Sequence, residues 1–202
     1  MNNYDIDDTS YLGSSENHHE SGRPISSYEE QAEAHASPES EFRETLKDAK
    51  EEEPGVWNNV QRASSHSHVM IYIYNGTSEK FVLSSASSGN VAEAKDYPVE
   101  PWDYWLFVPR EDIPYFARGR VSTQAKHSFI FESDNYAFEF STKLWVRKEY
   151  SALSFDPPTI PLREHNIKSI GKKPLQCTSR ITRTMKNGPY SYGIVISLGG
   201  NY

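Results

Sequence analysis

The chain has 202 residues, enough for one domain with an appendage, and its formal net charge is −7. Its single cysteine, Cys177, excludes an intrachain disulfide, and no apolar run approaches the roughly 18–20 residues that a membrane-spanning helix needs. The first residues lack the basic and apolar segments of a secretory signal peptide. We therefore expect a chain that is made in a reducing compartment and is intracellular or part of a virion.

The acidic residues are concentrated in the first third of the chain. Residues 1–66 carry 15 Asp and Glu against 5 Lys and Arg, a balance of −10, whereas residues 67–202 have a balance of +3. Residues 1–25 are polar and rich in Ser and Asn, so they cannot bury enough apolar area to offset the entropy of ordering, and we expect disorder there. We interpret residues 1–66 as an acidic arm and residues 67–202 as a folded domain.

A helix is predicted in the second half of the arm. Residues 38–53 open with a proline, which suits the first helical position, and continue with good helix formers until Pro54-Gly55, where the helix should end. Phe42, Leu46 and Ala49 fall at positions i, i+4 and i+7 and make a thin apolar stripe. We expect Phe42 and Leu46 to be the anchors by which this helix docks weakly on a neighbouring surface.

The folded domain begins with a predicted hairpin. Residues 69–74 follow the two-residue period of a strand, with Val and Ile alternating with Met and Tyr. Asn75-Gly76 is the strongest short-range hairpin signal, because a type I′ turn needs positive φ at both central residues. Phe81 and Leu83 then continue in the predicted returning strand.

A second hairpin is predicted around the turn Ser133-Asp134-Asn135. Phenylalanine occupies alternate positions on either side of this turn, and we predict that these four rings point into the core: Phe129, Phe131, Phe138 and Phe140. Further strands are predicted over residues 102–108, 144–148, 151–155, 178–185 and 190–198, with a long proline-rich connection over residues 156–174. About nine short strands and no strong helix after residue 60 indicate an all-β fold. We expect an antiparallel sandwich or jelly roll, with a barrel as the alternative closure.

The sequence contains no recognisable catalytic or metal-binding motif. His66 and His68 could place two imidazoles on one face of a strand, but a metal ion would need two further ligands. Basic neighbours could lower the pKa of Cys177, yet no particular histidine is indicated as its base. We therefore predict no enzymatic activity and no cofactor.

Two groups of residues are candidate binding surfaces. The basic group could face phosphates, nucleic acid or the acidic arm, or be a solvated loop: Lys168, Lys172, Lys173, Arg180 and Arg183. If residues 178–185 form a strand, Arg180 and Arg183 point to opposite faces. The aromatic group could belong to the core, an interface, a glycan platform or a lipid-headgroup surface: Trp102, Tyr104, Trp105, Trp145 and Tyr150.

Two resemblances bear on function. Pro101-Trp102-Asp103-Tyr104, then Phe107-Val108-Pro109-Arg110-Glu111, and the ending Tyr192-Gly193-Ile194-Val195-Ile196-Ser197 resemble segments of parvovirus-type, single jelly-roll coat proteins. Arg118-Gly119-Arg120-Val121 with the following Phe129–Phe140 hairpin is similar to membrane-binding sandwiches of the actinoporin and aegerolysin type. The first resemblance implies a self-assembling shell protein, and the second implies a lipid-binding module.

Taken together, these patterns favour a structural protein that is not an enzyme. We expect a self-assembling jelly roll of coat type, a homo-oligomer in which the acidic arm contacts basic surface on a neighbouring subunit. The alternative is a lipid- or glycan-binding sandwich of cytolysin or lectin type. Contact with nucleic acid through the basic C-terminal region stays open.

Overall fold

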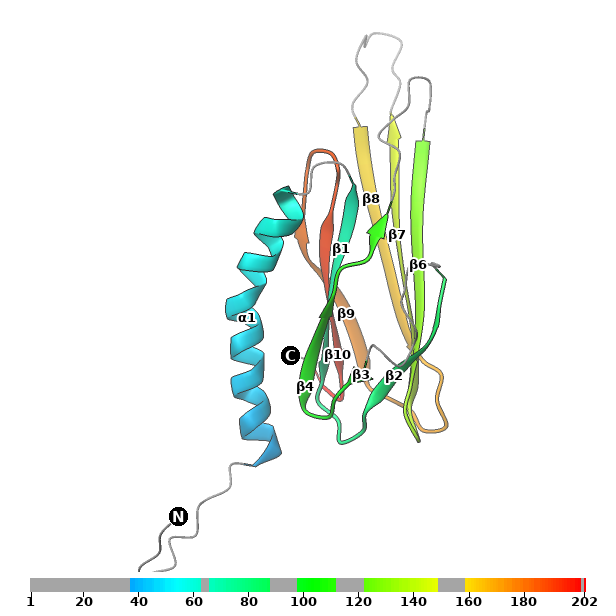
Figure 1. Cartoon of the computed structure of the whole chain (residues 1–202). Helices are drawn as coiled ribbons and strands as arrows, with labels where there is room; N and C mark the ends of the chain where they lie inside the picture. Colours follow the sequence, from blue (N-terminus) through cyan, green and yellow to red (C-terminus); the bar gives the residue numbers. More distant parts are fainter. Residues whose placement is uncertain (1–36, 63–65, 88–97, 112–121, 149–158, 201) are drawn as a thin grey trace, which may run out of the picture. The chain divides into compact units, whose positions relative to one another are not determined.

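The computed structural model describes residues 37–62, 66–87, 98–111, 122–148, 159–200 and 202, which form two five-stranded sheets and one helix (Figure 1). These residues belong to one structural unit, His35–Tyr202. The prediction of an all-β sandwich is confirmed, with ten described strands where about nine were expected. The predicted strand at residues 151–155 and the segment 1–36 lie outside the described residues.

The strands of the two sheets are far from sequence order. Sheet 1 has the order β4 (Asp103–Phe107), β1 (Ser67–Asn75), β10 (Tyr192–Leu198), β9 (Cys177–Thr184), and β5 (Arg110–Glu111) also pairs with β1. Sheet 2 has the order β3 (Pro98–Val99), β2 (Phe81–Ala86), β6 (Ser122–Glu132), β7 (Ala137–Lys148), β8 (Thr159–Ser169).

The main core lies between the sheets and is built from alternate residues of each strand. In sheet 2, the predicted aromatic row of the β6–β7 hairpin is fully buried: Phe129, Phe131, Phe138 and Phe140. In sheet 1, Ile71 and Ile73 of β1 and Ile194 and Ile196 of β10 face these rings. Both the second hairpin and the inward face of the closing strand are therefore confirmed.

Helix α1 (Pro38–Arg62) covers the other face of sheet 1 (Figure 1). Its buried side chains are Phe42, Leu46, Ala49, Trp57 and Val60, so the apolar stripe is longer than the three residues seen in the sequence. They pack on Met70, Tyr72 and Tyr74 of β1 and on Val195 of β10. The ring of Phe42 forms T-shaped pairs with Trp102 and Tyr202 at centroid distances of 6.0 and 5.0 Å.

The predicted end of the helix at Pro54-Gly55 is wrong. The helix continues through Pro54 to Arg62. An internal proline removes one backbone hydrogen bond and costs about 3 kcal/mol. Burial of Trp57 and Val60 against sheet 1 offsets this cost, because each of these side chains is removed almost entirely from water.

The hairpin predicted at Asn75-Gly76 is also wrong, because β1 and β2 belong to different sheets. The Asn75 amide donates to the backbone carbonyls of Glu79, Val99 and Glu100 at 2.8, 3.3 and 2.9 Å. The backbone N–H of Gly76 donates to Leu198 O at 2.9 Å. These bonds turn the Asn-Gly pair into a corner through which the chain passes from one sheet to the other.

Two further expectations about the sheets are corrected. Residues 156–174 were expected to form a connection, but residues 159–169 form β8, the outermost strand of sheet 2. An edge strand tolerates Pro161, because a proline there costs no ladder hydrogen bond when its missing N–H faces away from the sheet. The expectation of wholly antiparallel sheets fails at β1 and β10, which pair in parallel from Val69↔Tyr192 to Asn75↔Leu198.

Candidate ligand-binding face

The outer face of sheet 2, on the side away from the core, carries mainly polar side chains. Side chains alternate between the two faces of a strand, so burial of the aromatic row sends the intervening residues of β6 and β7 outward. The pairing register aligns these outward residues across β6, β7 and β8 into rows. The five rows are Ile130–Glu139–Lys168, Ser128–Ser141–Asn166, Lys126–Lys143–Glu164, Gln124–Trp145–Leu162 and Ser122–Arg147–Ile160. Neighbouring rows are about 7 Å apart and three strands span about 10 Å.

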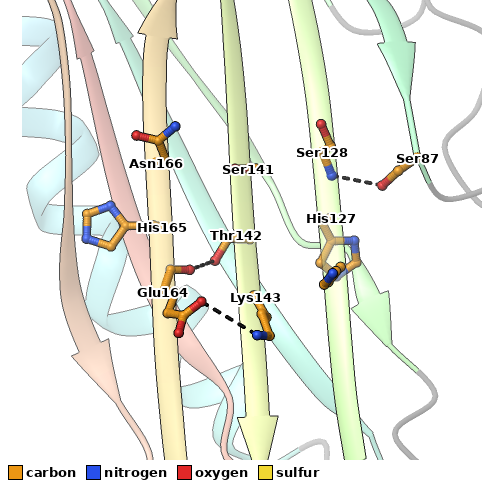
Figure 2. Close-up of a pocket in the computed structure, with 10 residues that line it drawn as sticks. Ser87, His127, Ser128, Ser141, Thr142, Lys143, Glu164, His165 and Asn166 are labelled. Atoms are coloured by element: carbon orange, nitrogen blue, oxygen red, sulfur yellow. Dashed lines mark hydrogen bonds and ion pairs between the residues drawn. The ribbon is translucent and has the colours of Figure 1, made fainter.

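A depression of about 750 Å³ lies over the Ser128–Ser141–Asn166 and Lys126–Lys143–Glu164 rows. Figure 2 shows its lining on three adjacent strands, with Ser87 at one side. All of the lining residues carry polar side chains: Ser87, Lys126, His127, Ser128, Ser141, Thr142, Lys143, Glu164, His165 and Asn166. Among the described segments, no other strand or helix contributes to this lining.

Several contacts fix the geometry of the depression (Figure 2). Ser87 Oγ accepts a hydrogen bond from the backbone N–H of Ser128 at 2.8 Å. Lys143 Nζ lies 3.7 Å from Glu164 Oε2 across the β7–β8 pair. The inward Thr142 hydroxyl donates to Glu164 O at 3.0 Å and lies 2.8 Å from the hydroxyl of Tyr192 in sheet 1. The floor of the depression is therefore tied to the sandwich core.

Two histidines border the depression but turn inward. His127 is only 2% exposed, stacks on Phe129 at 5.9 Å, and has its pKa lowered to about 4 by burial. It is neutral near pH 7 and is held in the core. His165 Nδ1 lies 2.8 Å from Ser179 Oγ of β9, so this ring links the two sheets.

Next to the depression, Trp145 lies between two cations on the outer face of β7. Lys143 Nζ is 5.3 Å from the centre of the indole ring, and Arg147 Cζ is 5.5 Å from it. Both distances are within the range of cation–π attraction, about 6 Å. This cationic stack, Lys143–Trp145–Arg147, holds two positive side chains in fixed positions.

The predicted basic residues are not brought together. Lys168 pairs with Glu139 at 2.7 Å on the outer face of sheet 2, Lys172 Nζ donates to Asp134 O at 3.1 Å, and Lys173 is an exposed loop residue. Arg180 and Arg183 lie on sheet 1 instead. Arg183 Nε pairs with Glu53 Oε1 of α1 at 3.0 Å, and Arg180 donates to Tyr202 O at 3.1 Å.

The prediction that Arg180 and Arg183 point to opposite faces is wrong. The register between β9 and β10 shifts between Gly193 and Ile194, so that Arg180 lies opposite Val195 and Arg183 opposite Gly193. This bulge inserts one residue, Thr182, and therefore restores both arginines to the face that α1 covers. The acidic helix thus contacts one basic residue of sheet 1 in its own chain, Arg183.

The predicted aromatic residues also separate. Trp102 and Tyr104 pack with the helix, and Tyr104 donates to Glu52 Oε2 at 2.8 Å. Trp105 stacks on Phe107 and packs against the core between the sheets. Trp145 is on the outer face of sheet 2, and Tyr150 lies outside the described residues.

Other candidate chemical groups show no reactive arrangement. Burial raises the pKa of the Cys177 thiol, contrary to the lowering that basic neighbours suggested. Within the described ranges, no cluster of three His, Cys, Asp or Glu could hold a metal ion. The helix found in this part of the chain lacks the combination of length and apolar character that crossing a bilayer requires.

Sequence reasoning missed the polar residues of the depression. The alternation in β6 and β7 contained a usable signal, because Lys126, Ser128, Ser141 and Lys143 alternate with buried positions of the same two strands. Glu164 and Asn166 gave none, since the sequence placed them in a connection. Neither a protein-family model nor a curated protein matches this chain.

Proposed function

We propose that this protein is a carbohydrate-binding β-sandwich and that the outer face of sheet 2 is its binding surface. The observation that carries this proposal is the depression of about 750 Å³, whose lining within the described part of the chain consists of polar residues. It combines hydroxyl, amide, ammonium and carboxylate groups on three strands. Such a surface offers donors and acceptors to a ligand rich in hydroxyl groups.

The chemistry of the lining favours a sugar over a lipid chain. Pockets for apolar ligands are lined mainly by hydrophobic and aromatic side chains, which bury most of the ligand. Here Asn166, Ser128 and Ser141 form one row of neutral hydrogen-bonding groups at the surface. A neutral hydrogen bond contributes about 0.5–1.5 kcal/mol, so a useful affinity requires several of them along an extended ligand.

Binding without hydrolysis fits the same lining. Most glycosidases use two carboxyl groups that flank the bond they cleave. Of the described residues that line the depression, only Glu164 carries a carboxylate, and it lies within ion-pair distance of Lys143. We therefore propose a binding role and no catalytic step.

The test is a binding screen of the full chain against immobilised oligosaccharides, followed by calorimetry. Asn166→Ala should weaken binding of the best oligosaccharide about fivefold, the loss of about one neutral hydrogen bond. Gln176→Ala is the matched control, because Gln176 is an exposed amide outside the depression. Equal effects of the two substitutions, or no binding to any oligosaccharide, would overturn the proposal.

Self-assembly as a jelly-roll shell stays a prediction, as does lipid binding. The proposed sugar-binding role requires neither an oligomer nor a membrane. Light scattering on the full chain tests assembly, and sedimentation with phospholipid vesicles tests lipid binding. A large, salt-sensitive assembly without sugar binding would favour the shell protein instead.

A further inference from the structure

The outer face of sheet 2 places like charges side by side. Lys126 and Lys143 are direct cross-strand partners on β6 and β7. Like charges in this position destabilise a sheet. Glu164 lies within ion-pair distance of Lys143 but not of Lys126. Lys126 makes no ion pair with any residue that the structure describes. The ammonium group of Lys126 is therefore a positive charge at the depression that no described carboxylate neutralises.

Arg147 adds a third cation on the same face. Trp145 separates it from Lys143 in the cationic stack, with both charges about equally far from the ring. The Nε atom of Arg147 is buried and has no hydrogen-bond partner among the described residues. A guanidinium presents several donors in a rigid plane that matches carboxylate and sulfate-like oxygens.

The charge on this face contrasts with that of the helix. The five outward rows contain Lys126, Lys143, Arg147 and Lys168 against Glu139 and Glu164, a balance of +2. Helix α1, on the far side of sheet 1, contains seven acidic and four basic residues, a balance of −3. Such an uneven field attracts an anionic ligand to sheet 2 and disfavours its approach to the helix.

We infer that the ligand of this face is an acidic carbohydrate, a sugar chain that carries carboxylate or sulfate groups. This inference rests on the proposed sugar-binding function. Hydroxyl groups of the chain meet the Ser128–Ser141–Asn166 row, and anionic groups meet Lys126, Lys143 and Arg147. Trp145 acts as a positioning residue, because it holds two of the cations in place.

Two other anionic partners, single-stranded nucleic acid and an anionic membrane, fit the face less well. Single-stranded nucleic acids are bound largely by stacking of bases on aromatic rings, whereas the Trp145 ring has Lys143 and Arg147 as neighbours. An anionic membrane would gain from apolar side chains that insert among the lipids, and the lining of the depression has none. Both become outcomes of the test.

The test compares three probes of similar length by calorimetry with the full chain: an oligogalacturonate, its carboxyl-reduced neutral form, and a sulfated neutral oligosaccharide. At least one acidic probe should bind about tenfold or more tightly than the neutral form. This preference should shrink as salt rises from about 0.05 to about 0.5 M, because screening shortens the reach of charges.

Variants locate the site. Lys126→Gln should weaken binding of the acidic probe about fivefold, since it removes one charge-assisted contact. Lys186→Gln is the matched control, an exposed lysine in the turn between β9 and β10. Trp145→Leu should weaken binding of the acidic probe more than binding of the neutral form, because it frees the two cations that the indole ring positions. Thermal melting confirms that each variant is folded.

The possible failures are distinguishable. If the neutral form binds as tightly as the acidic probes, the inference on charge is overturned while the sugar-binding function stands. If no oligosaccharide binds, both fall. If vesicles with anionic phospholipid or single-stranded DNA bind and the acidic sugars do not, the assignment of the ligand class is overturned.

Discussion

The outer faces of the two sheets differ in chemistry and in what covers them. In sheet 1, β1 and β10 are buried almost throughout, because Met70, Tyr72 and Tyr74 alternate with core residues and are themselves apolar or aromatic. In sheet 2, β7 alternates buried and half-buried residues from Phe138 to Arg147. Helix α1 packs on the first face, and no described element packs on the second.

This difference shows what decides whether a sheet acquires a third layer. A sheet face of tyrosine, methionine and valine is stabilised when it is removed from water, and an amphipathic helix packed on it provides that burial. Burial raises the pKa of Tyr74 to about 12. Burial and the hydrogen bond to Glu52 raise the pKa of Tyr104 to about 12 as well. A face of Lys, Ser and Asn has no such need and stays free for a ligand.

The largest expected effect concerns the core that both sheets share. Phe138→Ala and Phe140→Ala should each lower the free energy of unfolding by about 3–5 kcal/mol, because each ring is fully buried between the sheets. Urea denaturation measures these losses. Ser141→Ala, on the outer face of the same strand, is the control and should change stability by less than about 0.5 kcal/mol.

Two tryptophans test the comparison of the faces directly. Trp57 is 6% exposed beneath the helix, whereas Trp145 is half-buried on the open face. Trp57→Ala should cost about 3–4 kcal/mol because it leaves a cavity against sheet 1. Trp145→Ala should cost about 1 kcal/mol or less. Similar losses in urea denaturation would mean that the helix does not bury its face of sheet 1.

His127 gives the molecule a pH dependence that belongs to the sheet 2 side. Its pKa is about 4 in the fold against 6.5 when unperturbed, so the unfolded chain binds the proton more readily. Stability should be complete above pH 6.5 and fall by up to about 3 kcal/mol as the pH drops to 4. His127→Leu should flatten this slope in chemical denaturation across that window. The Ser133 hydrogen bond lowers the pKa of Glu79 from its usual value of 4.5, so the stability that this carboxylate contributes should be lost only as the pH falls below 4.5.

The smallest effect has the opposite sign and lies under the helix. Tyr72 is fully buried, and its hydroxyl has no hydrogen-bond partner within the described part of the chain. Desolvation raises its pKa. Removing a buried hydroxyl without a hydrogen-bond partner removes its desolvation penalty. Tyr72→Phe should therefore raise the free energy of unfolding by about 1 kcal/mol, as measured by urea denaturation. A loss of stability would show that this hydroxyl is hydrogen-bonded, for example by a buried water.

Features that depend on local periodicity could be predicted from the sequence. The β6–β7 hairpin follows from alternating rings around Ser133-Asp134-Asn135, and the inward row of β10 follows from Tyr192, Ile194 and Ile196. The start of α1 and its Phe42–Leu46 stripe follow from residue spacing. Each of these is set by neighbours within about ten residues, which is why a pattern can predict it.

Tertiary structure alone decided the pairing, and with it the candidate site. The parallel β1–β10 pair, the Asn75 corner, the bulge at Thr182 and the strand at residues 159–169 depend on contacts between distant parts of the chain. So does the Lys126–Lys143–Glu164 row, in which three strands contribute one residue each. A one-residue change of register would send every side chain of a strand to the other face, so the site exists only once long-range pairing has fixed that register.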